Sequence, residues 1–175
     1  MIHFITAVDT ELLGLALARG RLGEGFAPVR GFHLRDLAGS ALEAYLTREA
    51  PRARVIVARI LGGKSYFQEG FDRLAKLCRE RKIVFHTDAV QAVGKVPIDA
   101  RALGVDLLAL SGHKFDAPKG VGALFIRAGT PMRPVIAGHQ EKNRRGGTEN
   151  TAAIVGLGRA AELARTELDA HGLRL

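Results

Sequence analysis

Two short stretches place reactive side chains directly after apolar runs that have the length of buried strands. "LLALSGHK" ends in Ser111, His113 and Lys114, and "IVFHTDAVQ" carries Asp88 and Gln91. Burying an ammonium group is costly, and lysines are mostly exposed. A lysine that directly follows a core strand therefore suggests a chemical role.

The side chains of Lys114 and Asp88 are of the types that pyridoxal phosphate requires. A desolvated lysine amine has a lowered pKa and can form a Schiff base with an aldehyde. The cofactor also needs a carboxylate at its pyridinium nitrogen. Open α/β sheets collect ligand groups at the carboxyl ends of their strands, where both residues are expected. From the residues alone, an exposed strand-end cation is an equal alternative for Lys114.

The elements that must position these residues alternate between strands and helices. Runs of strand length recur in "IHFITAV", "ARVIVARIL", "IVFHTDAV", "VDLLALSG", "VGALFIR" and "MRPVIAG", with "GGKS" as a turn after the second. Helices are expected before Gly20, after a cap at Ser40, over "FQEGFDRLAKLCRERK", and after Asn150 or Thr151. This alternation predicts an α/β fold with a layered, mostly parallel sheet and helices on both faces.

Composition excludes several classes of protein. Of the 175 residues, 47% are hydrophobic and 25% charged, which is ordinary for a globular chain. No apolar run approaches the ~20 residues of a membrane span. The net charge of +8 comes from scattered cations without a nucleic-acid motif, so anionic small molecules are better expected partners than nucleic acid. The single cysteine, Cys78, excludes an internal disulfide or multi-cysteine metal site and indicates a cytoplasmic protein.

Four motifs, "HTDAVQ", "SGHK", "PKGVGAL" and "RRGGTEN", follow one another between about residues 77 and 170. In this order and spacing they resemble cysteine desulfurases, pyridoxal-phosphate enzymes of the class V aminotransferase group. The nearest type is the one used in nitrogen fixation and iron–sulfur assembly. The resemblance implies part of a fold-type-I large domain, pyridoxal 5'-phosphate as cofactor and L-cysteine as substrate. A homodimer and a sulfur-acceptor protein are the further partners it implies.

The resemblance also assigns roles to individual side chains that would hold the cofactor. These are Lys114 for the internal aldimine, Asp88 for the pyridinium nitrogen, Gln91 for the phenolic oxygen, Ser111 and His113 for the phosphate, and Thr148 for the phosphate of the partner subunit. His86 is interpreted as a structural strand-end residue. Cys78 shares an apolar helical stripe with Phe71 and Leu74, which predicts an inert scaffold thiol rather than a catalytic one.

The first part of the chain resembles a different family. Residues 3–77, and "RILGGKSYFQEG" above all, look like the amino-terminal end of the cobaltochelatase large subunit. We therefore expect a fragment of that kind over 1–77 and a desulfurase-like fragment over 78–175, joined inside "LAKLCRERK". Natural recombination, a gene-model artefact and an engineered chimera are all compatible with such a join.

The function expected from these resemblances is a cysteine desulfurase-type domain with impaired catalysis. The phosphate loop and ring-stacking histidine of the family are not found in residues 1–77, and its small domain and mobile cysteine loop are not found before Leu175. A non-catalytic α/β fragment is one alternative, and a tetrapyrrole-binding, chelatase-like fragment related to cobalamin synthesis is another. Binding of pyridoxal phosphate separates the first possibility from the other two.

Overall fold

The computed structural model describes residues 1–60 and 67–168. The expected "GGKS" turn lies outside the described residues. In chain order the elements are β1 (Ile2–Thr6), α1 (Asp9–Arg19), β2 (Val29–His33), α2 (Gly39–Ala44), β3 (Val55–Arg59), α3 (Gln68–Arg81), β4 (Val84–Asp88), β5 (Leu107–Ser111), the 3₁₀ turn η5 (Gly112–Phe115), β6 (Gly122–Ile126), α4 (Gln140–Asn143) and α5 (Thr151–Thr166).

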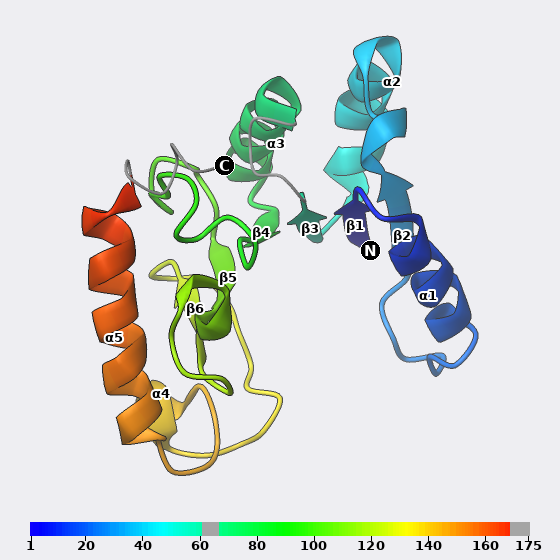
Figure 1. Ribbon diagram of the computed structural model, residues 1–175. Coiled ribbons are helices and arrows are strands. Elements are labelled where there is room, and N and C mark those ends of the chain that lie inside the picture. Colours follow the sequence, from blue (N-terminus) through cyan, green and yellow to red (C-terminus); the bar gives the residue numbers. More distant parts are fainter. Residues whose placement is uncertain (61–66, 169–175) are drawn as a thin grey trace.

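One sheet contains all of these strands, in the order β2-β1-β3-β4-β5-β6. Neighbouring strands run parallel from β2 to β5, and only β6 is antiparallel to its neighbour. Helices α2 and α3 lie on one side of the sheet, and α1 lies on the other (Figure 1). The expectation of a layered, mostly parallel α/β fold is confirmed.

The main core lies between the sheet and α3. Alternate strand residues such as Ile56, Phe85 and Leu108 are buried there. Helix α3 contributes Phe71 and Leu74 from one stripe, and the rings of Phe71 and Phe85 lie 5.1 Å apart between centroids. Successive strand residues point to opposite faces, so burial on this side fixes which residues face the other side.

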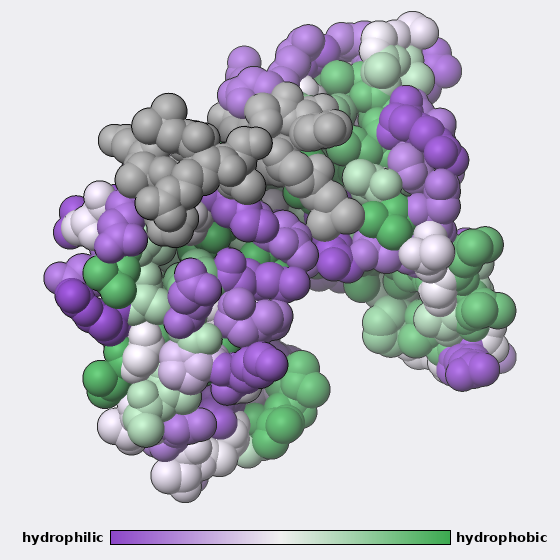
Figure 2. Space-filling model, in the orientation of Figure 1, coloured by the Kyte–Doolittle hydropathy of each residue, from purple (hydrophilic) through white to green (hydrophobic). Residues whose placement is uncertain are grey.

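The face opposite α3 is more open over the middle of the sheet. Arg59 ends β3 and Asp88 ends β4 on this face, and both are only half-buried. Figure 2 shows the molecule hollowed between α1 and the lobe that carries β6 and α5. Polar strand ends are therefore accessible on the side of the sheet that α3 leaves free.

Several local expectations are corrected or confirmed by the structure. The second helix begins at Gly39 after Ala38, so Ser40 lies inside its first turn and is not its cap. The expected strand "MRPVIAG" is absent, and no strand is assigned there among the described residues. Asn150 does cap the last helix, because its side chain accepts a hydrogen bond from the Ala153 N–H.

The expected division between 1–77 and 78–175 falls inside α3. The sheet continues across it, because β3 and β4 pair in parallel from Val55↔Val84 to Arg59↔Asp88. A division in sequence origin at this position stays a prediction, and the two parts share one sheet. Within the described ranges, none of the helices is long and apolar enough to cross a membrane.

Candidate cofactor site

The candidate site is organised by one row of residues across the carboxyl ends of the parallel strands. Thr6 on β1 pairs with Arg59 on β3, Arg59 pairs with Asp88 on β4, and Asp88 pairs with Ala109 on β5. Ser111 lies two residues beyond Ala109 and therefore points to the same face as Asp88. The register of the sheet thus brings one residue of each polar cluster, Asp88 and Ser111, to one edge and one face.

The Asp88 carboxylate contacts the protein through both oxygens. Its Oδ1 accepts a hydrogen bond of 2.9 Å from the Val90 N–H, which closes the loop after β4. Its Oδ2 lies 3.1 Å from Arg59 Nε. That Nε is buried but not aligned for a hydrogen bond, so the contact is an ion pair alone. Arg59 also pairs with Glu11 through Nη1.

The turn after β5 carries His113 and Lys114, two more of the predicted residues. Ser111 Oγ and His113 Nδ1 are 2.9 Å apart, so the hydroxyl and the imidazole form one polar pair. Lys114 is exposed in η5 and Gln91 is half-buried just beyond β4, whereas Thr148 is exposed in the loop between α4 and α5. Asp88, Ser111 and His113 are therefore associated with the two neighbouring strand ends, and Thr148 comes from a separate loop.

A cavity of about 500 Å³ lies between η5 and α5. Lys114, Phe115 and Pro118 line it from the η5 side, and Arg159 and Ala160 line it from α5. The other predicted site residues do not line this cavity. Lys114, an exposed residue, thus lines a cavity that Asp88, Ser111 and His113 do not line.

Two further titratable groups, one on β4 and one on α3, have shifted pKa values. Burial lowers the pKa of His86 on β4, and the charge of Asp88 partly opposes that shift. Burial, with a smaller contribution from Asp106, raises the pKa of the Cys78 thiol to about 12. A thiol with this pKa stays protonated at neutral pH, which agrees with the inert scaffold role expected for Cys78.

Sequence reasoning did not single out Arg59. It lies inside the run "ARVIVARIL", which indicates only a buried strand, and its partner Asp88 comes 29 residues later. The strand register alone brings the two side chains together. A cation inside an otherwise apolar run was the available signal.

The donor groups at this edge fit pyridoxal phosphate in type. An amine, a carboxylate and a hydroxyl–imidazole pair are the groups that would hold its aldehyde, ring nitrogen and phosphate. Asp88 and Ser111 face the open side of the sheet. The fit is imperfect at one point, because the Asp88 carboxylate already has a cationic neighbour in Arg59.

Comparisons with known proteins point to one family. The family model for class-V aminotransferases matches residues 67–173. The chain is 47% identical over 137 residues to a cysteine desulfurase of Gluconacetobacter diazotrophicus, a match that covers 77% of this chain and 34% of that protein. It is 55% identical over 108 residues to the cysteine desulfurase IscS of Dictyoglomus turgidum, covering 61% of this chain and 27% of that protein.

Solved structures agree with the sequence matches. A NifS-like protein superposes with a TM-score of 0.73 at 29% identity, over 96% of this chain and 47% of that chain. DndA from Streptomyces lividans superposes with a TM-score of 0.69 at 28% identity, over 96% of this chain and 49% of the other. The described sheet is therefore part of the fold of NifS-like proteins, and it extends through the amino-terminal part of this chain.

The extent of these matches bears on the two parts of the sequence. The match of 137 residues is longer than the stretch 78–175, so it includes part of the segment before residue 78. The chain spans about a third of the length of the curated relatives it matches. Since the family model covers more than half of the residues, the chain belongs to the class-V aminotransferase family.

Proposed function

We propose that this chain binds pyridoxal 5'-phosphate and forms part of a cysteine desulfurase, which mobilises sulfur from L-cysteine for iron–sulfur cluster assembly. The observation that carries the proposal is the pairing of β4 with β5. It directs the Asp88 carboxylate and the Ser111 hydroxyl to one face, directly before the turn that bears Lys114. The identity of the relatives named above supports the choice of reaction.

Each predicted residue has a part in this proposal. Pyridoxal phosphate, when bound, supplies an electron-withdrawing ring that stabilises negative charge on the substrate carbon. Lys114 holds the aldehyde through its amine and carries protons at its Nζ, and Asp88 keeps the ring nitrogen protonated. Gln91 donates to the phenolic oxygen, while Ser111 and His113 bind the phosphate.

The remaining parts of the proposal concern partners. L-cysteine is the proposed substrate, and one of the solved neighbours is described as SspA in complex with cysteine. Thr148 is proposed to bind the cofactor phosphate in a second copy of the chain. Such a residue must be exposed, and Thr148 is exposed in its loop. A homodimer, a sulfur-acceptor protein and a cytoplasmic location complete the proposal. The relatives reported above give no support to a cobaltochelatase-like origin of residues 3–77.

Titration with pyridoxal phosphate tests the proposal directly. The protein should develop a visible absorption band, and borohydride reduction followed by peptide mapping should place the modification on Lys114. Lys114→Ala should remove the band. Lys119→Ala is the matched control, because Lys119 is an exposed lysine five residues further along the same loop. A label on Lys119 or Lys95 in place of Lys114 would contradict the assignment.

A further inference from the structure

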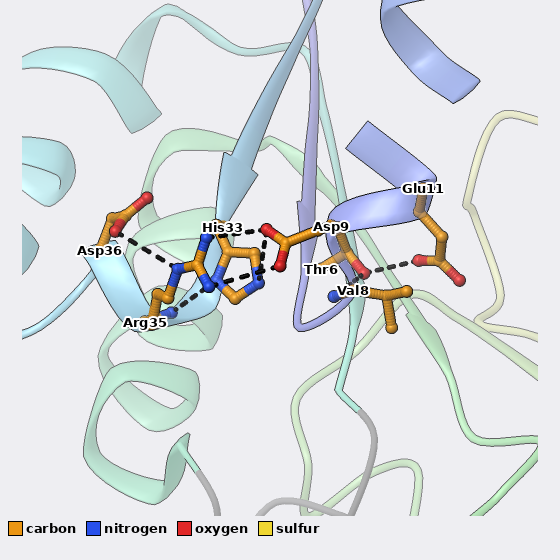
Figure 3. A network of polar contacts seen from close by, with 7 residues as sticks. All are labelled: Thr6, Val8, Asp9, Glu11, His33, Arg35 and Asp36. Atoms are coloured by element: carbon orange, nitrogen blue, oxygen red, sulfur yellow. Dashed lines mark hydrogen bonds and ion pairs between the residues drawn. The ribbon is translucent and has the colours of Figure 1, made fainter. Parts of the chain in front are cut away.

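Arg59 and Glu11 link the amino-terminal part of the chain to the candidate cofactor site. Glu11 lies in the first turn of α1, where Thr6 Oγ1 donates a hydrogen bond of 2.5 Å to its Oε2 (Figure 3). The other carboxylate oxygen of Glu11 pairs with Arg59, and Arg59 lies 3.1 Å from Asp88. A chain of polar contacts thus runs across three parallel strands and ends on Asp88.

The position of Arg59 in this chain of contacts has an electrostatic consequence. Its guanidinium lies between two carboxylates, and its side chain is 37% exposed, so the ion pairs are only partly screened by water. A protonated ring nitrogen that approached Asp88 would meet a cation already at the carboxylate. The two cations would repel each other and share one acceptor.

We propose that Arg59 lowers the affinity of this chain for pyridoxal phosphate by competing with the cofactor's ring nitrogen for Asp88, and that Glu11 moderates the competition by drawing the guanidinium away. This inference rests on the proposed function. By this proposal, Arg59 and Glu11 in the amino-terminal part of the chain control the affinity of the cofactor site. An isolated arginine or glutamate in the sequence would not suggest such a role. The contact of Arg59 with Asp88 lacks hydrogen-bond alignment, so it is the weaker of the guanidinium's two contacts and the one a ligand can displace.

Opposite effects are expected for the two neighbouring side chains. Arg59→Met keeps an unbranched apolar stem and removes the charge, so the dissociation constant for pyridoxal phosphate should fall about tenfold, the size of one charge-assisted hydrogen bond. Glu11→Gln leaves Asp88 as the only carboxylate beside Arg59, so the dissociation constant should rise. The double variant Arg59→Met/Glu11→Gln should have the same dissociation constant as Arg59→Met. Glu11 acts only through the Arg59 cation, which is absent from both variants.

The experiment is an absorbance titration of each variant with pyridoxal phosphate, with thermal unfolding recorded to establish that each is folded. Arg73→Met is the matched control, because Arg73 has the same exposed fraction of 37% and pairs with Glu43 on the other side of the sheet. It should bind like the parent chain. The double variant removes both charged partners together, so it tests the proposal even if Arg59→Met alone does not fold.

Equal affinities of the parent chain and the folded Arg59 variants would overturn the inference while leaving the proposed function intact. Unchanged or tighter binding by Glu11→Gln would overturn it as well. If no variant and no parent protein bound the cofactor at any concentration, the proposed function would fail and the inference with it. Binding by the Arg59 variants alone would support the inference in its strongest form.

Discussion

Among the titratable residues that the structure describes, His3 is the least exposed, and it is the second residue of β1. Its side chain is fully buried, Nδ1 lies 3.1 Å from the Tyr45 hydroxyl, and its ring lies 5.0 Å from that of Phe32. Burial, followed by the nearby charge of Arg30, lowers the pKa of His3 from 6.5 to about 4, and Glu49 opposes part of that shift. The folded protein therefore holds this imidazole neutral where the unfolded chain protonates it.

His3 should make the protein less stable in acid. Because its pKa is depressed in the folded state, its contribution is fully present above pH 6.5 and is lost as the pH falls towards 4, by about 3 kcal/mol in total. Urea unfolding at a series of pH values measures this loss. In His3→Gln the dependence over this window should flatten, and an unchanged slope would show that other groups are responsible.

Cys78 should be unreactive in the native protein. It is 1% exposed, and its pKa of about 12 leaves almost no thiolate at neutral pH. A thiol reagent such as iodoacetamide should label it at least about a hundredfold more slowly in buffer than in denaturant, because modification requires opening of the helix. Comparable rates in the two conditions would show that α3 leaves the thiol accessible.

The burial of Cys78 also predicts that this chain alone does not release sulfur catalytically. The sequence contains no other cysteine, and a buried thiol in α3 cannot accept sulfur at Lys114. With pyridoxal phosphate, cysteine and a reductant present, alanine and sulfide should not accumulate over many turnovers. Sustained formation of both products that is lost in Cys78→Ser would refute the scaffold role.

At the scale of the elements, α5 follows Asn150, whose side chain caps it. The Asn150 side chain accepts a hydrogen bond of 3.2 Å from the Ala153 N–H at the first turn. The helix packs through Leu157 and Ala160 against Phe115 in η5. Its stability is therefore coupled to the turn that carries Lys114.

Loss of this cap should destabilise the protein. Asn150→Ala should lower the free energy of unfolding by about 0.5–2 kcal/mol, whereas Asn150→Asp should retain most of it because aspartate is an equally good cap. Denaturant unfolding followed by circular dichroism distinguishes the two. Equal losses in both variants would indicate that Asn150 acts through something other than its side-chain oxygen.

The elements also show what the sequence could predict. The sequence predicted strands β1, β3, β4 and β5 and helices α1 and α3. In each of these segments the apolar residues follow a pattern typical of one kind of element, either strand or helix. The expected strand "MRPVIAG" was wrong, since Pro134 cannot donate to a neighbouring strand and Val135 and Ile136 are exposed. Likewise, the pairing of Arg59 with Asp88 depends on strand register, which no local pattern specifies.

At the scale of the whole molecule, one sheet unites the two parts that the sequence suggested. Helix α3 crosses the expected division at residue 77. Phe71 and Leu74, which precede the division in the sequence, and Cys78, which follows it, are buried in the same core. Strands β3 and β4 pair across it along their full length. The two parts therefore depend on each other for burial of their apolar surfaces.

Unfolding should consequently be a single cooperative transition. Denaturant curves followed by circular dichroism and by labelling of Cys78 should coincide, as they do for a two-state domain. Residues 1–77 and 78–175, expressed separately, should not reach the ellipticity per residue of the full chain. Two separated transitions, or a stable isolated half, would show that the division marks two independent folding units.

Strand β6 is the last strand of the sheet in the described part of the chain, and its outer edge has no neighbour there. It presents Ala123 and Leu124 as exposed residues next to a row of open backbone hydrogen-bonding groups. An apolar, unprotected edge of this kind is a template for self-association through added strands. Self-association of the protein in concentrated solution thus depends on what covers β6. Replacing Ala123 with lysine should keep the protein monodisperse.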